Sequence, residues 1–271
     1  MPKDVHVLIV EDDPYALDLM AMLLTRDWRT RVVGETHQED EIIALLNHPT
    51  QKVDILLLDT EIPGDPKWAF ELAKKVRTTK SHPAILCTGT RTDEIILRQL
   101  QEAEFNGYII KSEIHYALAW GVKLAAQGKW VITKGVRSVA LNARVPLPAN
   151  TIVVDGTMQM IDFSVRQWEI IRLAILFNQT RSEVAEELRI RPDSVSDTVS
   201  ESYEKLGLHE ILSGEVAAET YIEDVTVLRQ FNQILARIPE KSRASGKIRK
   251  SSDMSTLAFH LLTIPEEKEI I

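Results

Sequence analysis

The sequence predicts an α/β domain with a five-stranded parallel sheet, followed by a smaller all-α domain. Over residues 1–128, five short apolar runs alternate with five amphipathic segments. This pattern is typical of a parallel sheet covered by helices on both faces. From Asp162 onward the apolar residues recur at helical spacing instead. Proline and glycine gather between the two regions, so we interpret residues 129–158 as a linker with some strand content.

Each predicted strand of the first domain is short and precedes a predicted helix. We expect strands at 5–10, 31–34, 53–58, 84–87 and 107–110. The helices are expected at 14–25, 39–47, 68–76, 93–102 and 113–127. Nearly continuous apolar runs, such as residues 5–10, indicate strands that are buried on both faces of a parallel sheet. The alternation therefore defines one domain over residues 1–128.

The all-α domain is predicted over residues 159–209. Its first helix carries Ile170, Ile171, Ala174 and Phe177 on one face. Its second covers residues 183–188, and its third runs from Pro192 to a stop at Gly207. An amphipathic run at 210–240 predicts a further C-terminal helix, which could dimerise or pack on the domain core. The tail at 241–271 is first basic and then apolar. Its apolar cluster is either a docking peptide or a closing helix, and we favour the closing helix.

Composition and charge exclude several classes of protein. The net charge of −8 disfavours nucleic-acid binding by the chain as a whole and leaves only a local basic patch. The single cysteine, Cys87, excludes an internal disulfide and fits a reducing cytosol. There is no long apolar run and no signal-peptide pattern at the N-terminus. We therefore expect a cytoplasmic protein without a membrane partner.

Polar side chains follow four of the predicted strands. Three acids come directly after the first strand, Asp59 follows the third, and Thr88 and Lys111 end the fourth and fifth. Ligands of open α/β sheets bind beyond these carboxyl ends. Converging carboxylates repel each other, and a hard divalent cation such as Mg²⁺ relieves that repulsion. Such a cluster, with a lysine and a hydroxyl, suits phosphoryl transfer to an attacking aspartate.

Four segments, "LIVEDDP", "LLLDT", "ILCTG" and "GYIIK", together resemble the receiver domain of two-component response regulators, a flavodoxin-like (βα)5 fold. The resemblance implies that Asp59 accepts a phosphoryl group from a cognate histidine kinase. It also implies that Mg²⁺ or Mn²⁺ is held by Glu11, Asp12, Asp59 and the backbone carbonyl of Glu61. Lys111 would pair with the phosphoryl group and Thr88 would bond to it. Tyr108 would then change rotamer and displace the face formed by the fourth helix, fifth strand and fifth helix.

Some of these residues have an alternative interpretation. Asp13 precedes Pro14, so it is either an N-cap or a further metal ligand. Thr88 could merely end a strand, Tyr108 could be a core residue and Lys111 could be solvated. Their joint placement at four strand ends argues against that. The loop after Pro63 is also about two residues longer than is usual in the family, and Ser112 replaces the usual residue after Lys111.

The segment "FSVRQWEIIRLAILFNQTRSEVAEELRIRPDSVSDTVSESYEKLGL" resembles the helix-turn-helix of LuxR-type regulators, the NarL group included. The resemblance implies DNA binding and a homodimer on activation. Its candidate contacts to bases and phosphates are Arg181, Arg189, Arg191, Ser194, Ser196, Asp197, Thr198 and Ser200.

The third helix of this segment is unusually acidic for a DNA reader. The family commonly carries Thr-Val-Lys-x-His where this chain has Ser194, Val195, Ser196, Asp197 and Thr198. Cations at such positions contribute affinity for the phosphates of DNA. Two hypotheses therefore stand. In the first, the chain is a transcription regulator switched by phosphorylation, and the basic tail adds affinity. In the second, the helix-turn-helix no longer binds DNA and mediates phosphorylation-dependent protein interactions.

A weaker third hypothesis is a phosphate sink. In no case do we expect an enzyme beyond a receiver that assists its own phosphorylation and dephosphorylation.

Overall fold

The computed structural model describes residues 4–62, 66–155, 163–237, 251–264 and 266–269. It divides into two compact units. The first unit contains residues 3–158 together with 265–271, and the second contains residues 159–264. In the described residues no helix is long and apolar enough to cross a membrane.

The first unit is built on one eight-stranded sheet in the order β2-β1-β3-β4-β5-β6-β7-β8. The neighbours from β2 to β7 are parallel, and β8 is antiparallel to β7. The strands are β1 (Val5–Val10), β2 (Thr30–Thr36), β3 (Ile55–Asp59), β4 (Ala84–Gly89), β5 (Gly107–Ile110), β6 (Trp130–Ile132), β7 (Thr151–Asp155) and β8 (Glu266–Glu269). The predicted α/β class with a parallel sheet is confirmed.

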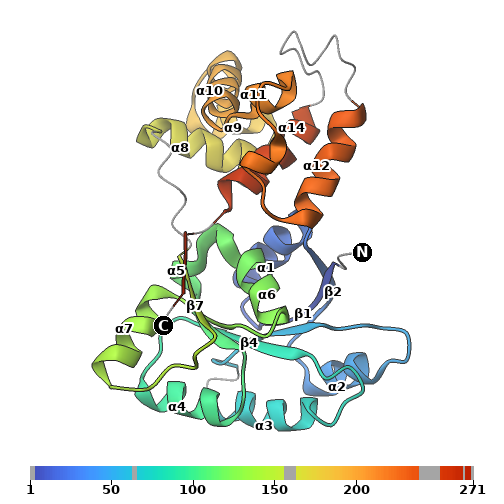
Figure 1. Cartoon of the computed structure of the whole chain (residues 1–271), viewed down its shortest axis with the longest axis vertical. Coiled ribbons are helices and arrows are strands. Elements are labelled where there is room, and N and C mark those ends of the chain that lie inside the picture. The colour runs from blue at the N-terminus through green and yellow to red at the C-terminus, as the bar shows by residue number, and fades with distance from the viewer. Residues whose placement is uncertain (1–3, 63–65, 156–162, 238–250, 265, 270–271) are drawn as a thin grey trace. The chain divides into compact units, whose positions relative to one another are not determined.

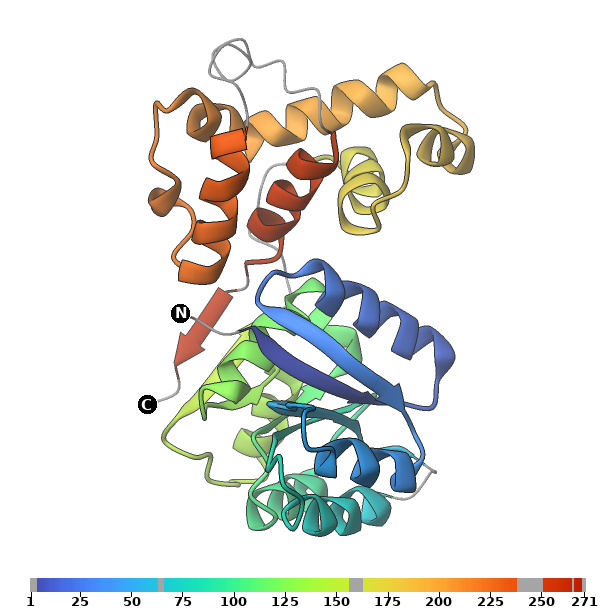
Figure 2. The ribbon, with the colours of Figure 1, turned by 90° about the vertical axis from the view of Figure 1, so that its right-hand side faces the viewer.

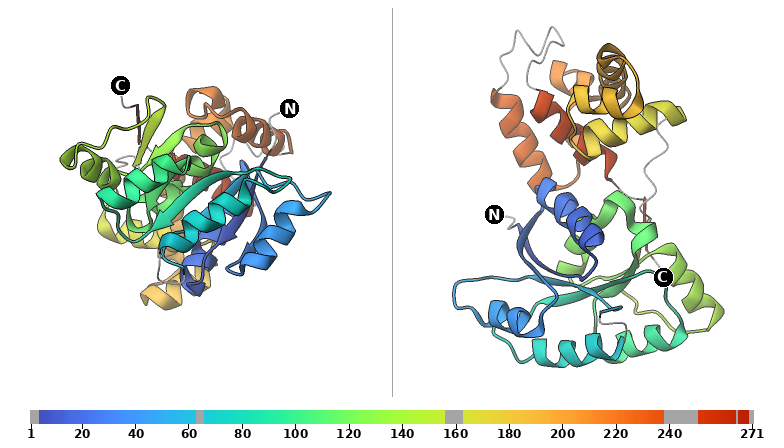
Figure 3. Two further views of the ribbon diagram at one scale, coloured as in Figure 1. Left: turned by 90° about the horizontal axis from the view of Figure 1, so that it is seen from below. Right: turned by 180° about the vertical axis from the view of Figure 1, so that it is seen from behind.

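Helices cover both faces of this sheet (Figure 1). One face carries α1 (Pro14–Arg26) and α6 (Leu118–Ala126), and the other carries α2 (Glu39–Asn47), α3 (Pro66–Val76), α4 (Glu94–Glu102) and α7 (Lys134–Asn142). The view from below shows α2, α3, α4 and α7 lying over their face of the sheet (Figure 3). Alternate residues of β1 enter opposite cores, Leu8 on the α2–α4 face and Ile9 on the α1–α6 face.

The prediction of a linker over residues 129–158 is wrong. Residues 129–155 contain β6, α7 and β7, which extend the sheet beyond β5, and with β8 the sheet has eight strands rather than five. The strand content that we expected there is present. A second correction concerns the predicted helix at 113–127, which is divided into α5 (Lys111–Ile114), a 3-10 turn η1 (His115–Ala117) and α6. His115 has a φ of +41° at this break.

The second unit is helical (Figure 2). Its elements are α8 (Val165–Ile171), the π-helical η2 (Arg172–Leu176), α9 (Arg181–Leu188), α10 (Pro192–Lys205), α11 (Leu208–Ser213), the 3-10 turn η3 (Ala218–Thr220), α12 (Val225–Arg237) and α14 (Ser251–Leu262). Capping boxes begin two of the helices, Ser164 with Gln167 at α8 and Thr180 with Glu183 at α9. Val184 and Val195 are buried where α8, α9 and α10 pack together.

The prediction of one helix over 210–240 is also wrong. α11 ends at Gly214, whose φ of +82° terminates a helix. After the 3-10 turn η3, α-helix resumes at α12, where the Asp224 carboxylate accepts hydrogen bonds from the amides of Thr226 and Val227. In the tail, residues 241–250 lie outside the described residues. Leu257 and Phe259 of α14 are buried, and α14 contacts η2 and α12, which fits the closing-helix interpretation.

Candidate functional site

The predicted site residues of the first unit meet at the carboxyl edge of the sheet. β3 and β4 end side by side, with Asp59 paired to Thr88 in register. Glu11 follows β1 directly, and Lys111 follows β5 as the first residue of α5. Because the parallel strands end together, residues far apart in sequence come into contact here.

Lys111 is the cation at the centre of this site. Its Nζ lies 2.7 Å from Glu11 Oε2 and 3.3 Å from Asp59 Oδ2. Both carboxylates are almost fully buried, and their remaining described hydrogen bonds come from backbone amides, Asp13 to Glu11 at 3.1 Å and Glu61 to Asp59 at 3.2 Å. A single ammonium therefore balances two buried carboxylates, which leaves the site with an excess of negative charge.

The pKa of Asp59 reflects this imbalance. Burial raises it from 3.8 to about 6, Lys111 opposes the rise, and Glu11 adds to it. For Lys111, burial alone lowers the pKa, but Glu11 and Asp59 together hold it above its ordinary value. Near neutral pH the lysine is thus charged, and Asp59 is mostly an anion that gains from a second cation.

Three carboxylates form a candidate metal site. One oxygen each from Glu11, Asp12 and Asp59 lies within 4.8 Å of the others. Asp12 is exposed, which leaves the cluster open to solvent on one side. All-oxygen ligands with room for water suit Mg²⁺, and the excess negative charge fits a divalent cation. The structure places the carboxylate of Asp13 elsewhere, because it caps α1 by accepting from the amides of Tyr15 and Ala16.

Thr88 and Tyr108 lie behind the carboxylates. Thr88 is buried, and its Oγ1 has no hydrogen-bond partner within the described part of the chain. A buried hydroxyl without a partner is costly, and a ligand oxygen next to Asp59 would satisfy it. The Tyr108 side chain is completely buried, with its hydroxyl 2.7 Å from the carbonyl oxygen of Arg91.

Two residues of this region were not predicted from the sequence. Thr60 follows Asp59 and Gly89 follows Thr88, and both lie against the Tyr108 hydroxyl. The sequence offered one indication of them. Each directly follows a site residue, Asp59 or Thr88, at the end of a strand.

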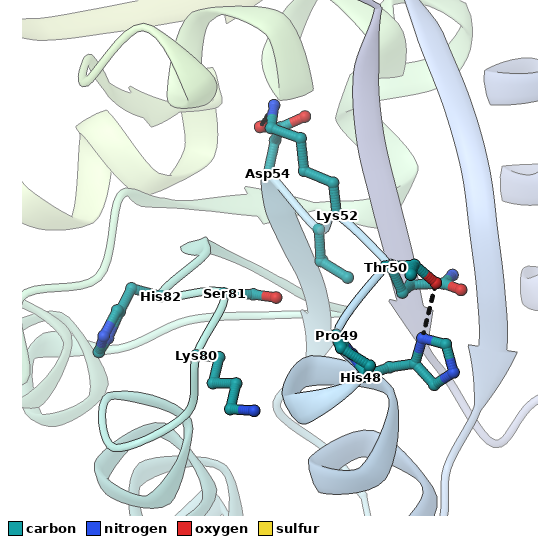
Figure 4. Close-up of a pocket in the computed structure, with 10 residues that line it drawn as sticks. His48, Pro49, Thr50, Lys52, Asp54, Lys80, Ser81 and His82 are labelled. Carbon is teal, nitrogen blue, oxygen red and sulfur yellow. Dashed lines mark hydrogen bonds and ion pairs between the residues drawn. The ribbon is translucent and has the colours of Figure 1, made fainter.

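A polar hollow at the opposite edge of the sheet is a different feature. It encloses about 400 Å³ between the loops that precede β3 and β4, and its lining includes His48, Lys52, Lys80 and His82. The rings of His48 and His82 lie on opposite sides and point away from each other (Figure 4). Lys52 is already paired with Asp54. These groups do not converge on a common point, so the hollow is not the candidate site.

Comparison with known proteins matches much of the first unit to a family. Residues 7–119 match the model of the response regulator receiver domain. The first unit carries a response regulator receiver domain. The matched residues include Glu11, Asp59, Thr88 and Lys111, and β6, α7, β7 and β8 lie beyond them.

Curated relatives extend the similarity into the second unit. The chain is 24% identical over 210 residues to the Fimbriae Z protein of Salmonella typhimurium, covering 78% of this chain and 94% of that protein. It is 24% identical over 208 residues to the probable transcriptional regulatory protein NarL of Mycobacterium tuberculosis, covering 76% and 90%. The interpretation of a receiver domain followed by a LuxR/NarL-type helix-turn-helix domain is confirmed.

Among solved structures, the chain is similar to RcsB of Salmonella enterica bound to a promoter, with 19% identity and a TM-score of 0.45, covering 76% of this chain and 93% of that one.

In the LuxR-type domain, α9 and α10 form the helix pair with the turn Arg189–Arg191 between them. Arg189 is left-handed with a φ of +53° and caps α9, and Arg191 is the N-cap residue of α10 without a side-chain cap. Of the candidate contacts, Ser196 and Thr198 are half-buried, and the others are exposed: Arg181, Arg189, Arg191, Ser194, Asp197 and Ser200.

The exposed face of α10 is acidic in the structure as well as in the sequence. Asp193, Asp197 and Glu204 are exposed, and Glu201 is paired with Lys205 at 3.1 Å. Arg191, the nearest cation at the start of the helix, contacts Asp193 at 3.3 Å. The Ser196 hydroxyl donates to the carbonyl oxygen of Pro192. The cations of this face therefore lie at its ends.

Proposed function

We propose that this protein is a phosphorylation-switched transcription regulator. Asp59 accepts a phosphoryl group from a histidine kinase, and the helix-turn-helix domain binds DNA when the receiver is phosphorylated. The observation that carries the first part is the buried Asp59 next to Lys111 at 3.3 Å, beside a Thr88 hydroxyl that has no hydrogen-bond partner among the described residues. That arrangement offers a nucleophile, a cation and a free hydroxyl donor at one strand edge.

The chemistry follows from these residues. A carboxylate oxygen of Asp59 forms a bond to phosphorus as the P–N bond to the kinase histidine breaks, giving an acyl phosphate. Lys111 and the Thr88 hydroxyl are placed to neutralise and hydrogen-bond the phosphoryl oxygens. Glu11, Asp12, Asp59 and the backbone carbonyl of Glu61 would hold Mg²⁺. When bound, Mg²⁺ supplies charge neutralisation on the transferring oxygens.

Labelling with an acyl phosphate tests the receiver chemistry. In the presence of Mg²⁺ the wild type is expected to form one hydroxylamine-sensitive phosphoryl group per chain, and Asp59→Asn to form none. Asp54→Asn is the matched control, because Asp54 precedes the same strand at its other end and pairs with His6 and Lys52. Equal labelling of Asp59→Asn and the wild type would refute the assignment.

DNA binding is supported by the relatives rather than by the charge of α10. The similar protein of Mycobacterium tuberculosis is named a probable transcriptional regulatory protein, and the chain covers 90% of its length. A gel shift on genomic fragments, at low salt and with the phosphorylated protein, tests it. Retarded fragments whose affinity falls with salt are the expected result. No retardation under these conditions would instead favour a domain that binds protein, and a homodimer on phosphorylation is expected in either case.

A further inference from the structure

The residues on either side of Lys111 are held by a part of the sheet that lies beyond the matched receiver residues. The amide of Ile110, directly before Lys111, donates to the hydroxyl oxygen of Thr133 at 3.2 Å. The carboxylate of Glu113, two residues after Lys111, accepts from the amide of Gly135 at 2.8 Å. Thr133 and Gly135 lie where β6 ends and α7 begins. We call these two hydrogen bonds the lysine clamp.

The backbone around Lys111 has little support of its own. α5, which begins at Lys111, has only four residues, and a single helical turn is not stable in isolation. It ends at His115, which has a φ of +41°. The pairing of β5 with β6 reaches only Tyr108 and Ile132. The lysine clamp therefore extends the attachment of this segment to β6 and α7 past the end of the strand pairing.

The two hydrogen bonds exchange partners between neighbouring elements. Thr133 is the N-cap residue of α7, and an N-cap threonine usually accepts from an amide of its own helix. Here its side chain makes no such bond and accepts from Ile110 of β5 instead. The carboxylate of Glu113 accepts from Gly135, in the first turn of α7, where a negative charge is favourable. Each side thus satisfies a backbone amide of the other.

Burial and space both favour this arrangement. Thr133 is completely buried, so water does not replace its hydroxyl at the Ile110 amide. A Cβ atom at position 135 would lie 2.5 Å from Glu113 Oε1 and 2.8 Å from Ile110 Cδ1. Glycine at position 135 therefore lets the carboxylate reach the helix amide, and alanine there would displace it.

Lys111 depends on accurate placement, because its one charge is divided between two buried carboxylates. Its Nζ lies 2.7 Å from Glu11 and 3.3 Å from Asp59. A shift of the lysine backbone would change both distances. The same two carboxylates belong to the cluster that could hold a metal ion, so the ammonium and a metal cation compete for them.

We propose that Thr133 and Glu113 are positioning residues that fix the backbone on both sides of Lys111 and thereby place its ammonium at the phosphoryl-transfer site. The β6–α7 extension is then a functional part of the receiver. This inference rests on the proposed receiver function, because it concerns the lysine of that site. Neither residue belongs to the carboxylate cluster, and both act through Lys111.

Two pairs of variants separate the hydrogen bonds from the shape of the side chains. Thr133→Val removes the hydroxyl and Glu113→Met removes the carboxylate, whereas Thr133→Ser and Glu113→Gln keep an oxygen that accepts. Gly135→Ala displaces the Glu113 carboxylate without changing it. Thr151→Val is the matched control. Thr151 is also almost completely buried in the extension, but it lies at the start of β7 and donates to Pro148 O.

The first readout is the rate at which acetyl phosphate labels the full chain in saturating Mg²⁺. Thr133→Val, Glu113→Met and Gly135→Ala are expected to be labelled about tenfold more slowly, because the group that neutralises the transferring oxygens is misplaced. Thr133→Ser and Glu113→Gln are expected to recover most of the rate, and Thr151→Val to keep it. All variants are first checked for the wild-type circular dichroism spectrum.

The second readout is the affinity for Mn²⁺ without any phosphoryl donor, measured by electron paramagnetic resonance. A displaced Lys111 competes less for the carboxylates, so Thr133→Val and Glu113→Met are expected to bind Mn²⁺ about threefold more tightly. General damage to the site would weaken Mn²⁺ binding instead. In a Lys111→Met background the same substitutions should cause no further gain, because the lysine through which they act is absent.

The outcomes separate the two claims. Wild-type labelling rates in Thr133→Val and Glu113→Met would overturn the clamp proposal. Mn²⁺ binding that is unchanged or weaker would also overturn it, as would a gain that persists without Lys111. If Thr133→Val does not fold, Glu113→Met and Gly135→Ala decide, because they alter the partly exposed side of the clamp. A wild type that is never labelled would overturn the receiver function, and the Mn²⁺ affinities would still test the clamp.

Discussion

The ammonium of Lys111 lies nearer to the carboxylate of Glu11, at 2.7 Å, than to that of Asp59, at 3.3 Å. Lys111 thus pairs with two buried carboxylates at once, and its single charge neutralises neither of them completely. It leaves Asp59 with a raised pKa and a need for further positive charge.

Removal of the Lys111 charge is expected to destabilise the metal-free protein. Lys111→Met leaves Glu11 and Asp59 buried without a cation, at a cost of about 3 kcal/mol in the free energy of unfolding. Added Mg²⁺ is expected to recover part of this loss. Urea unfolding in EDTA and in Mg²⁺ measures both effects. Lys75→Met, which removes an exposed pair with Glu39, is the control and should leave the stability nearly unchanged.

Asp59→Asn is expected to stabilise the metal-free protein near neutral pH. Folding raises the pKa of Asp59 from 3.8 to about 6, so the folded state binds more protons between these values. The free energy of unfolding of the wild type therefore falls as the pH rises through this window. At pH 7.5 the variant should be more stable by about 2–3 kcal/mol. Urea unfolding in EDTA between pH 3.5 and 7.5 checks this. An advantage that does not shrink toward low pH would contradict it.

Restoring cations to α10 is expected to strengthen DNA binding. Ser196→Lys with Thr198→His places basic groups at two positions of the acidic helix. Each new phosphate contact should steepen the dependence of log affinity on log salt by about 0.9. Gel shifts over a salt series measure the slope. Lys substitution at exposed Glu223, outside the helix pair, controls for net charge. An equal gain from both variants would argue against contact through α10.

The capping boxes are expected to stabilise the second unit. Thr180→Ala removes the hydroxyl that accepts from the Glu183 amide and also loses the reciprocal arrangement, at a cost of about 1 kcal/mol. Ser164→Ala should cost a similar amount at α8. Hydrogen exchange of the amides in α8 and α9 reports the local stability. Ser200→Ala, at an exposed mid-helix position, should leave it unchanged or slightly improved.

The sequence was enough to predict the strands that have strong apolar runs, but not the strands whose apolar pattern is weak or absent. The predicted strand at 5–10 matches β1, and that at 107–110 matches β5. β6 has three residues, too few to show a period, and Pro146 and Pro148, which precede β7, are typical of a connection. β8 has the sequence EEKE, which carries no strand signal. Backbone pairing to a neighbour, rather than side-chain pattern, determines such strands.

The residues of the candidate site could be predicted from the sequence more completely than the residues around them. Acids and a lysine at successive strand ends must converge, whatever the details of the loops. The structure brings Glu11, Asp12, Asp59 and Lys111 together, although their functional roles remain predictions. Pro63, in the longer loop, lies outside the described residues. The role of Thr60 in contacting Tyr108 depends on rotamers and on the missing side chain of Gly89, which no periodic pattern encodes.

The strand β6 has a consequence for fragments of this protein. Gly107 approaches β6 so closely that a Cβ there would lie 1.9 Å from Val131 O, and Tyr108 pairs with Ile132. A chain that ends at residue 128, the boundary that the sequence suggests, would lack β6, the strand that pairs with β5. The exposed backbone groups would then form an edge that can recruit strands from other molecules. Such a truncated receiver would be prone to aggregation, whereas one extended through β7 keeps β5 inside the sheet.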